Sequence, residues 1–142
     1  MIKRTAKAVW KGDLKEGKGK LKLGSGAFKG KYSFTSRFED GVGTNPEELI
    51  GAAHAGCFSM ALSGDLTKAG YVVDEIKTEA IVSMDKGESG FYISGIKLVT
   101  KAKVQDIAME EFAKIASGAK ENCPVSKALK AVDVQLEAHL LK

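Results

Sequence analysis

Residues 44–62 read TNPEELIGAAHAGCFSMAL, and this stretch has the features of a long, closely packed helix. Thr44 or Asn45 can cap its N-terminus through a side-chain oxygen. Pro46 fits the first turn, where its missing N–H costs nothing. Helices commonly stop at a glycine, so we expect the helix to run to about Ala69 and to end at Gly70.

The helix is unusual in its content of small residues. Glycine lowers helix stability, so its abundance here indicates a packing role. Small side chains let other backbones approach on several sides, as in a helix at the centre of a sheet pair or at a subunit interface. The residues concerned are Gly51, Ala52, Ala53, Ala55, Gly56, Ser59, Ala61, Ser63 and Gly64. Cys57 lies among them, and its simplest interpretation is one more small apolar residue.

The remaining segments predict an α+β fold. Apolar residues alternate with polar ones before and after the helix, as in strands, and two segments have helical periodicity. We expect strands at 6–10, 17–23, 28–38, 71–84, 91–104 and 132–140, a hairpin turn at 85–90, and helices at 107–119 and 124–130. No linker or repeat interrupts the chain, so residues 1–142 are expected to form a single domain.

The net charge is +4, from 22 basic and 18 acidic residues, and much of the excess lies before residue 32. These lysines alternate with apolar or glycine positions, as on the solvated face of strands. Arginine is scarce and aromatic residues are not interleaved with the lysines, which disfavours nucleic-acid binding.

The N-terminal residues lack the apolar core of a signal peptide, and no apolar run reaches the ~20 residues of a membrane span. We therefore expect a cytoplasmic protein without a membrane partner. Structural disulfides are rare in the cytosol, so Cys57 and Cys123 are expected to be reduced, catalytic or redox-active. Together with His54 and His139 they show none of the close pairs used by zinc sites, and we expect neither metal nor cofactor.

Cys123 precedes Pro124, which favours a helix start directly behind the thiol. The partial positive charge of a helix N-terminus shifts a thiol toward thiolate. One cysteine in a packed helix and another at a helix start indicate a reacting pair, as in a thiol redox enzyme.

Three further side chains could act on Cys57. Arg37, expected near a strand end, would stabilise a thiolate and offer donors to peroxide oxygens, although it could equally pair with neighbouring acidic residues on the surface. Glu47 lies ten positions before Cys57, ~15 Å along a helix, so it could reach this thiol only from a second, antiparallel copy. His54 lies three positions before Cys57 on the same helical face, which leaves a Cys–His couple for acyl transfer open.

The sequence resembles the osmotically inducible protein C (OsmC) family, to which the organic hydroperoxide resistance proteins are related. The resemblance is carried by residues 43–62, by Asn122 to Leu129 (NCPVSKAL) and by Arg37-Phe38-Glu39, and it extends over essentially the whole chain. It implies antiparallel sheets wrapped around a long central helix, in an intertwined homodimer with active sites at the subunit interface.

The resemblance also implies a thiol-dependent peroxidase for organic hydroperoxides and hydrogen peroxide, acting in oxidative-stress defence. By position, Cys57 corresponds to the peroxidatic cysteine and Cys123 to the resolving one, while Arg37 and Glu47 arrange the site around the thiolate. A dithiol of the lipoyl type is the expected reductant. A redox-sensing or scaffold protein that uses the same cysteine pair is the alternative.

Overall fold

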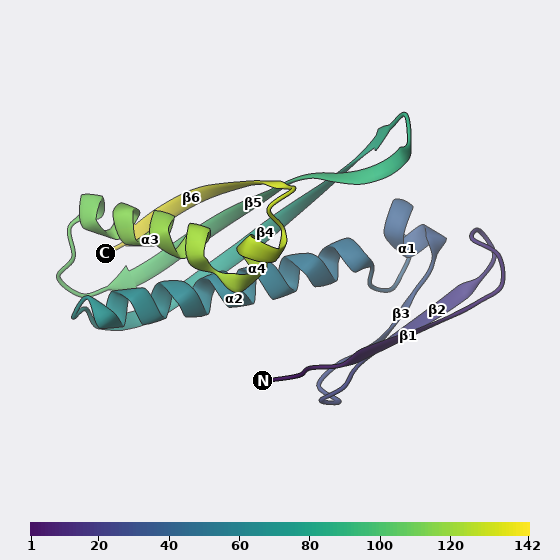
Figure 1. Ribbon diagram of the computed structural model, residues 1–142, viewed down its shortest axis with the longest axis horizontal. Helices are drawn as coiled ribbons and strands as arrows, with labels where there is room; N and C mark the ends of the chain where they lie inside the picture. The colour runs from purple at the N-terminus through teal and green to yellow at the C-terminus, as the bar shows by residue number, and fades with distance from the viewer. The chain divides into compact units, whose positions relative to one another are not determined.

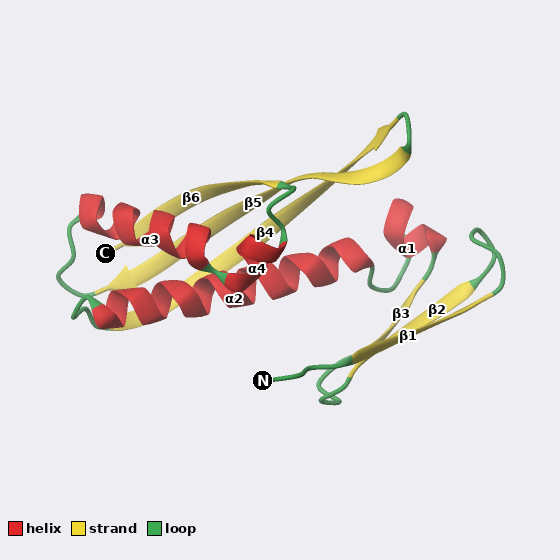
Figure 2. Cartoon of the chain, in the orientation of Figure 1, coloured by secondary structure: helices red, strands yellow, loops and turns green.

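The computed structural model describes all residues, 1–142, and the chain divides into two compact units, Met1–Leu49 and Ile50–Lys142. Figure 1 labels the helices and strands, and Figure 2 distinguishes helix, strand and loop. Each unit contains its own three-stranded sheet. The predicted α+β class is therefore confirmed.

The first unit holds an antiparallel sheet in the order β1 (Ala6–Lys11), β2 (Lys18–Leu23) and β3 (Lys29–Tyr32). The lysines of β2 and β3 alternate with less exposed residues, as predicted, whereas β1 is exposed except at Trp10. Cross-strand pairing places several of them opposite one another, in the pairs Lys7–Lys22, Lys11–Lys18, Lys20–Lys31 and Lys22–Lys29. One face of this sheet is consequently strongly basic.

Gly19, on the middle strand of this sheet, lies between two aromatic side chains. It pairs with Trp10 on β1 and Tyr32 on β3, whose rings lie 5.4 Å apart. A Cβ atom at position 19 would clash with both rings. Only glycine lets the two aromatic side chains close over the middle strand.

The predicted strand over residues 28–38 is wrong in its second half. β3 ends at Tyr32, and Phe34–Phe38 forms a short helix, α1. Ser33 and Ser36 form a capping box: Ser33 Oγ accepts from Ser36 N (3.2 Å), and Ser36 Oγ accepts from Ser33 N (2.8 Å). Arg37 is therefore on a helix and not at a strand end.

Helix α2 (Pro46–Lys68) follows the prediction closely. Asn45 is the capping residue, since its Oδ1 accepts from the backbone N of Glu48 at 2.7 Å. Gly70 follows the helix with φ +93°, a conformation that favours glycine and ends the helix as expected. The first turn of α2 belongs to the first unit, and the rest of the helix to the second.

The second unit contains a sheet in the order β4 (Val73–Gly87), β5 (Gly90–Val104) and β6 (Asp133–Leu141). β4 and β5 pair antiparallel up to Gly87–Gly90, so the hairpin turn is tighter than predicted. β6 pairs parallel to β5, which corrects the expectation of purely antiparallel sheets. The crossover through two helices, α3 (Met109–Asn122) and α4 (Pro124–Ala128), brings the chain back in the same direction.

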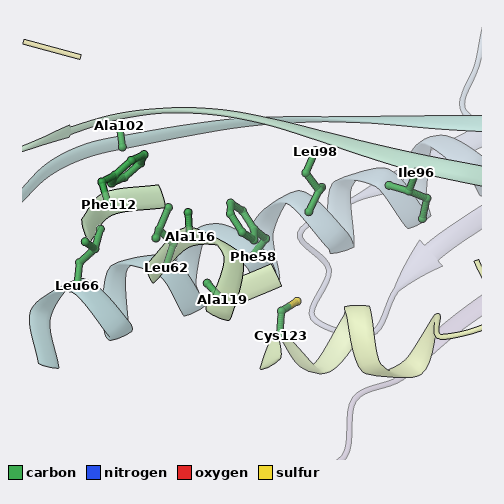
Figure 3. Packing of buried hydrophobic residues seen from close by; sticks show 10 residues of the cluster. All are labelled: Phe58, Leu62, Leu66, Ile96, Leu98, Ala102, Phe112, Ala116, Ala119 and Cys123. Atoms are coloured by element: carbon green, nitrogen blue, oxygen red, sulfur yellow. The ribbon is translucent and has the colours of Figure 1, made fainter. Parts of the chain in front are cut away.

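The core of this unit lies between the sheet and the helices α2 and α3 (Figure 3). Alternate residues of β5 point into it, and helix-spaced residues of α2 and α3 meet them. The fully buried members are Phe58, Leu62, Leu66, Leu98, Ala102, Phe112, Ala116, Ala119 and Cys123. No helix has the length and apolar character needed to cross a membrane.

Candidate active site

Cys57 lies in the middle of α2 and is half-buried. Its neighbour in sequence, Phe58, points into the core and is completely buried, whereas Met60 is exposed. Cys57 itself packs against the edge of the same core. Its sulfur is therefore held by a rigid helix but remains partly accessible.

Cys123 occupies the junction of two helices. Its backbone N–H donates to Ala119 O at 2.9 Å and ends α3, and Pro124 behind it takes the first position of α4. The side chain is fully buried and belongs to the core (Figure 3). The predicted helix start behind the thiol is confirmed.

The two cysteine sulfurs lie 2.9 Å apart, although 66 positions separate them in the sequence. Both thiols are free. At this distance one thiol donates a hydrogen bond to the other sulfur, and a single negative charge can be shared by the pair. The two cysteines are therefore close enough to react with each other without a large movement of the chain.

The surroundings shift the pKa values of the two thiols in opposite directions. Burial and the adjacent Cys123 sulfur raise the pKa of Cys57, while the backbone N–H of Val125 acts in the opposite direction. Burial also opposes ionisation of Cys123, but hydrogen bonds from Cys57, Ser126 and the Val125 N–H outweigh it and lower the pKa of Cys123. Within this unit, the resting charge of the pair is favoured on the buried sulfur.

The other two predicted site residues form an ion pair in the first unit. Arg37 Nε donates to both carboxylate oxygens of Glu47 (3.1 and 3.2 Å), and Arg37 Nη2 donates to Glu47 Oε1 at 2.7 Å. Glu47 is largely buried, and about a third of the Arg37 side chain is exposed. Such a multiply bonded pair fixes the guanidinium plane.

Local structure explains why Arg37 and Glu47 meet. Ser36, next to Arg37, donates its hydroxyl to Thr44 O at 2.7 Å, and Asn45 Nδ2 donates to Ser36 O at 3.1 Å. These bonds tie α1 to the start of α2. Glu48, the next residue, is exposed and accepts from the Thr44 hydroxyl at 2.7 Å. Arg37 therefore pairs with Glu47 and not with the acidic residues adjacent to it in the sequence.

An apolar pocket of about 250 Å³ lies beside Arg37. Its walls are mainly aromatic, from β1, β3, α1 and the loop after β1. The lining residues are Trp10, Leu14, Tyr32, Ser33, Phe34, Arg37 and Phe38. This pocket was not foreseen from the sequence, because residues 28–38 were expected to form one strand.

His54 is completely buried and does not form a couple with Cys57. Its Nε2 lies 2.7 Å from Ser126 Oγ, and its Nδ1 has no hydrogen-bond partner. Burial lowers the pKa of His54, so the imidazole is neutral at physiological pH. The Cys–His arrangement left open by the sequence is therefore absent.

The four predicted residues thus appear as two pairs, Cys57 with Cys123 and Arg37 with Glu47. Sequence reasoning missed Ser126, whose Oγ lies 2.7 Å from His54 Nε2 and which lowers the pKa of Cys123. Its position in the first turn of a helix behind Pro124 was the available signal. No group of three or more His, Cys, Asp or Glu side chains is arranged to hold a metal ion.

A buried sulfur in contact with a partly accessible one defines a thiol redox site. The sequence model of the OsmC-like proteins matches residues 38–137. Peroxiredoxin OsmC of Escherichia coli (strain K12) is 48% identical over 141 residues, which cover 96% of this chain and 99% of the relative. The organic hydroperoxide resistance protein OhrB of Bacillus subtilis (strain 168) is 38% identical over 101 residues, covering 70% and 72%. The chain belongs to the OsmC-like protein family.

Solved structures agree with this assignment. The crystal structure of OhrB from Bacillus subtilis superimposes with a TM-score of 0.74 at 32% identity, covering 94% of this chain and 97% of that one. An organic hydroperoxide resistance protein OsmC from Legionella pneumophila gives a TM-score of 0.73 at 25% identity, covering 95% and 96%. The resemblance found in the sequence is confirmed.

Proposed function

We propose that the protein is a thiol-dependent peroxidase that reduces organic hydroperoxides, and also hydrogen peroxide, in defence against oxidative stress. The observation that carries this proposal is the 2.9 Å contact between the sulfurs of Cys57 and Cys123. Relatives named peroxiredoxin OsmC and organic hydroperoxide resistance protein support it.

Cys57 is the peroxidatic residue, because it is the more accessible of the two. When the pair carries one negative charge, the shared proton can pass to Cys123 and leave a thiolate on Cys57. This thiolate attacks the distal peroxide oxygen, and the O–O bond breaks. The products are a sulfenic acid on Cys57 and an alkoxide, which takes up a proton and leaves as the alcohol.

Cys123 is the resolving residue. Its thiolate attacks the sulfenic sulfur of Cys57, a disulfide forms, and hydroxide leaves and is protonated to water. The sulfurs are already in contact, so the step needs little movement. An external dithiol, of the lipoyl type, then reduces the disulfide by exchange and restores both thiols.

Arg37 stabilises the Cys57 thiolate and the developing charge on the peroxide, and Glu47 holds the guanidinium in place. The three hydrogen bonds between Arg37 and Glu47 support the second role. Because Arg37 keeps a third of its side chain exposed, donors remain for a substrate.

The active enzyme is a homodimer with its sites at the subunit interface. Helix α2 supports this proposal: Ala52, Gly56, Met60 and Gly64, spaced four apart, form an exposed stripe. Nothing lies within 4 Å of a Cβ built at Gly56 or Gly64. A second copy of α2, running antiparallel, would use the small residues that this chain leaves unpartnered.

The apolar pocket beside Arg37 supports organic hydroperoxides as the preferred substrate class. Its aromatic walls favour a hydroperoxide with a hydrocarbon group over hydrogen peroxide. All 142 residues act as one OsmC-like domain, and the free cysteines fit the reducing cytoplasm.

Steady-state peroxide consumption tests the proposal. The wild type, Cys57→Ser and Cys123→Ser are each mixed with cumene hydroperoxide or hydrogen peroxide, with dihydrolipoamide as reductant. We expect continuous turnover in the wild type, none in Cys57→Ser, and a single turnover per chain in Cys123→Ser. Normal consumption by Cys57→Ser would refute the mechanism. A wild type that reacts once and does not cycle with excess dithiol would instead be the redox-sensing alternative.

A further inference from the structure

Four polar side chains lie close together in the second unit: His54 and Cys57, three positions apart on α2, and Cys123 and Ser126, three positions apart at the start of α4. His54 Nε2 lies 2.7 Å from Ser126 Oγ, and the Cys123 sulfur lies 2.9 Å from that of Cys57. Ser126 follows Cys123 by three positions, in the first turn of α4, and it lowers the pKa of the Cys123 thiol. His54 and Cys123 are both completely buried. Of these four side chains, the proposed peroxidase mechanism uses only the two cysteines.

The direction of these hydrogen bonds follows from the unpaired nitrogen of His54. Its Nδ1 is buried without a partner, so a proton there would be an unsatisfied N–H, which folded proteins rarely bury. We therefore assign the proton of the neutral ring to Nε2, from where it donates to Ser126 Oγ. The Ser126 hydroxyl hydrogen is then free to point at the Cys123 sulfur.

We propose that His54 is a positioning residue that acts through Ser126: it fixes the Ser126 hydroxyl as a donor to Cys123 and so promotes the attack of Cys123 on the oxidised Cys57. This inference rests on the proposed peroxidase function and deepens it. The donor stabilises the Cys123 thiolate, whose electron pair forms the S–S bond as hydroxide leaves Cys57. It gives no help to the earlier attack of Cys57 on the peroxide.

Cys57 is the titratable side chain in contact with the Cys123 sulfur, and His54 lies next to Ser126. Ser126 also lines a pocket of about 360 Å³, whose charged lining residues are Lys120, Glu121, Lys127, Lys130 and Asp133. All of them stay unchanged in the variants below.

Two measurements on the full-length protein test the inference. The first is single-turnover reaction with cumene hydroperoxide, quenched at intervals, with sulfenic acid trapped by dimedone and disulfide counted by intact-mass spectrometry. The second is titration of the Cys123 thiolate by its ultraviolet absorbance in a Cys57→Ala background, without peroxide.

Ser126→Ala and His54→Leu should slow disulfide formation about tenfold, since a hydrogen bond to a charged group is commonly worth at least that factor. The rate of sulfenic acid formation should not fall. The titration midpoint of Cys123 should rise by about one pH unit in Ser126→Ala, the same factor expressed as a pKa. His54→Gln, whose amide can still donate to Ser126, should stay within about threefold of the wild type.

Ser59→Ala is the matched control, because Ser59 also lies on α2 and donates to a half-buried partner, Thr78 Oγ1, at 2.8 Å. Unchanged disulfide formation and an unchanged midpoint in folded Ser126→Ala and His54→Leu would overturn the inference. Equal slowing in His54→Gln and Ser59→Ala would also overturn it, because loss of packing would then be the cause. A wild type that forms no sulfenic acid would refute the peroxidase proposal, and the peroxide-free titration would still decide the inference.

Discussion

Oxidation of Cys57 and Cys123 to a disulfide should raise the free energy of unfolding substantially. The bond would close a loop between positions 66 apart in the sequence. The loss of chain entropy in the unfolded state for a loop of this length corresponds to ~4 kcal/mol, and native-state strain reduces that figure. Sulfurs 2.9 Å apart need to approach by less than about 1 Å to reach bonding distance, so little strain is expected. We therefore expect a gain of about 2–4 kcal/mol.

Guanidinium denaturation of the reduced and oxidised wild type, at one fixed protein concentration, measures this gain. Cys123→Ser, carried through the same oxidation, is the control and should show no increase. An oxidised wild type that unfolds at the same denaturant concentration as the reduced protein would refute the assigned geometry of the pair.

Three other perturbations have defined outcomes. Glu47→Gln should lower kcat/KM for cumene hydroperoxide about tenfold or more, because Arg37 loses its charged partner. Glu48→Gln, a change at the exposed neighbouring residue, is the control and should change kcat/KM less than about twofold. Equal losses in the two variants would contradict the role of Glu47. Burial lowers the pKa of His54 from 6.5, so at mildly acidic pH the unfolded chain binds a proton that the folded chain does not. The free energy of unfolding should therefore decrease as the pH is lowered from ~6.5 toward the folded-state pKa. The decrease should be at most about 1.4 kcal/mol per pH unit. Denaturation curves from pH 8 to pH 5 measure this slope, His54→Gln should make it shallower, and an equal slope in the variant would exclude His54 as its source. Phe112→Ala, in the centre of the core, should cost about 3–5 kcal/mol of unfolding free energy; a loss below about 1 kcal/mol would be inconsistent with its complete burial.

Local signals in the sequence were enough to predict most elements. Asn45, Pro46 and Gly70 mark the ends of α2, and alternation over long segments marks β4, β5 and β6. The cysteine pair was predicted from the helix start at Pro124 and from the family resemblance. These features depend on residues close together in the chain or on a long motif.

What the sequence did not reveal depends on contacts between distant residues or on weak local signals. Helix α1 was missed because the aromatic residues of 28–38 recur near period two, and its capping box uses Ser36 where glutamate or glutamine is usual. The parallel pairing of β6 was missed because alternation gives no strand direction. The bond between His54 and Ser126 joins residues 72 apart, which no local pattern indicates.

The stoichiometry of a single peroxide turnover tests the proposed chemistry most directly. Reduced protein is mixed with one equivalent of cumene hydroperoxide per chain, blocked with an alkylating agent and digested with trypsin without reduction. We expect loss of both thiols for each peroxide consumed and a disulfide-linked pair of peptides, residues 38–68 and 121–127. Peroxide left unconsumed, or both cysteines recovered as alkylated thiols, would contradict the assignment of Cys57 and Cys123 as a peroxide-reducing pair.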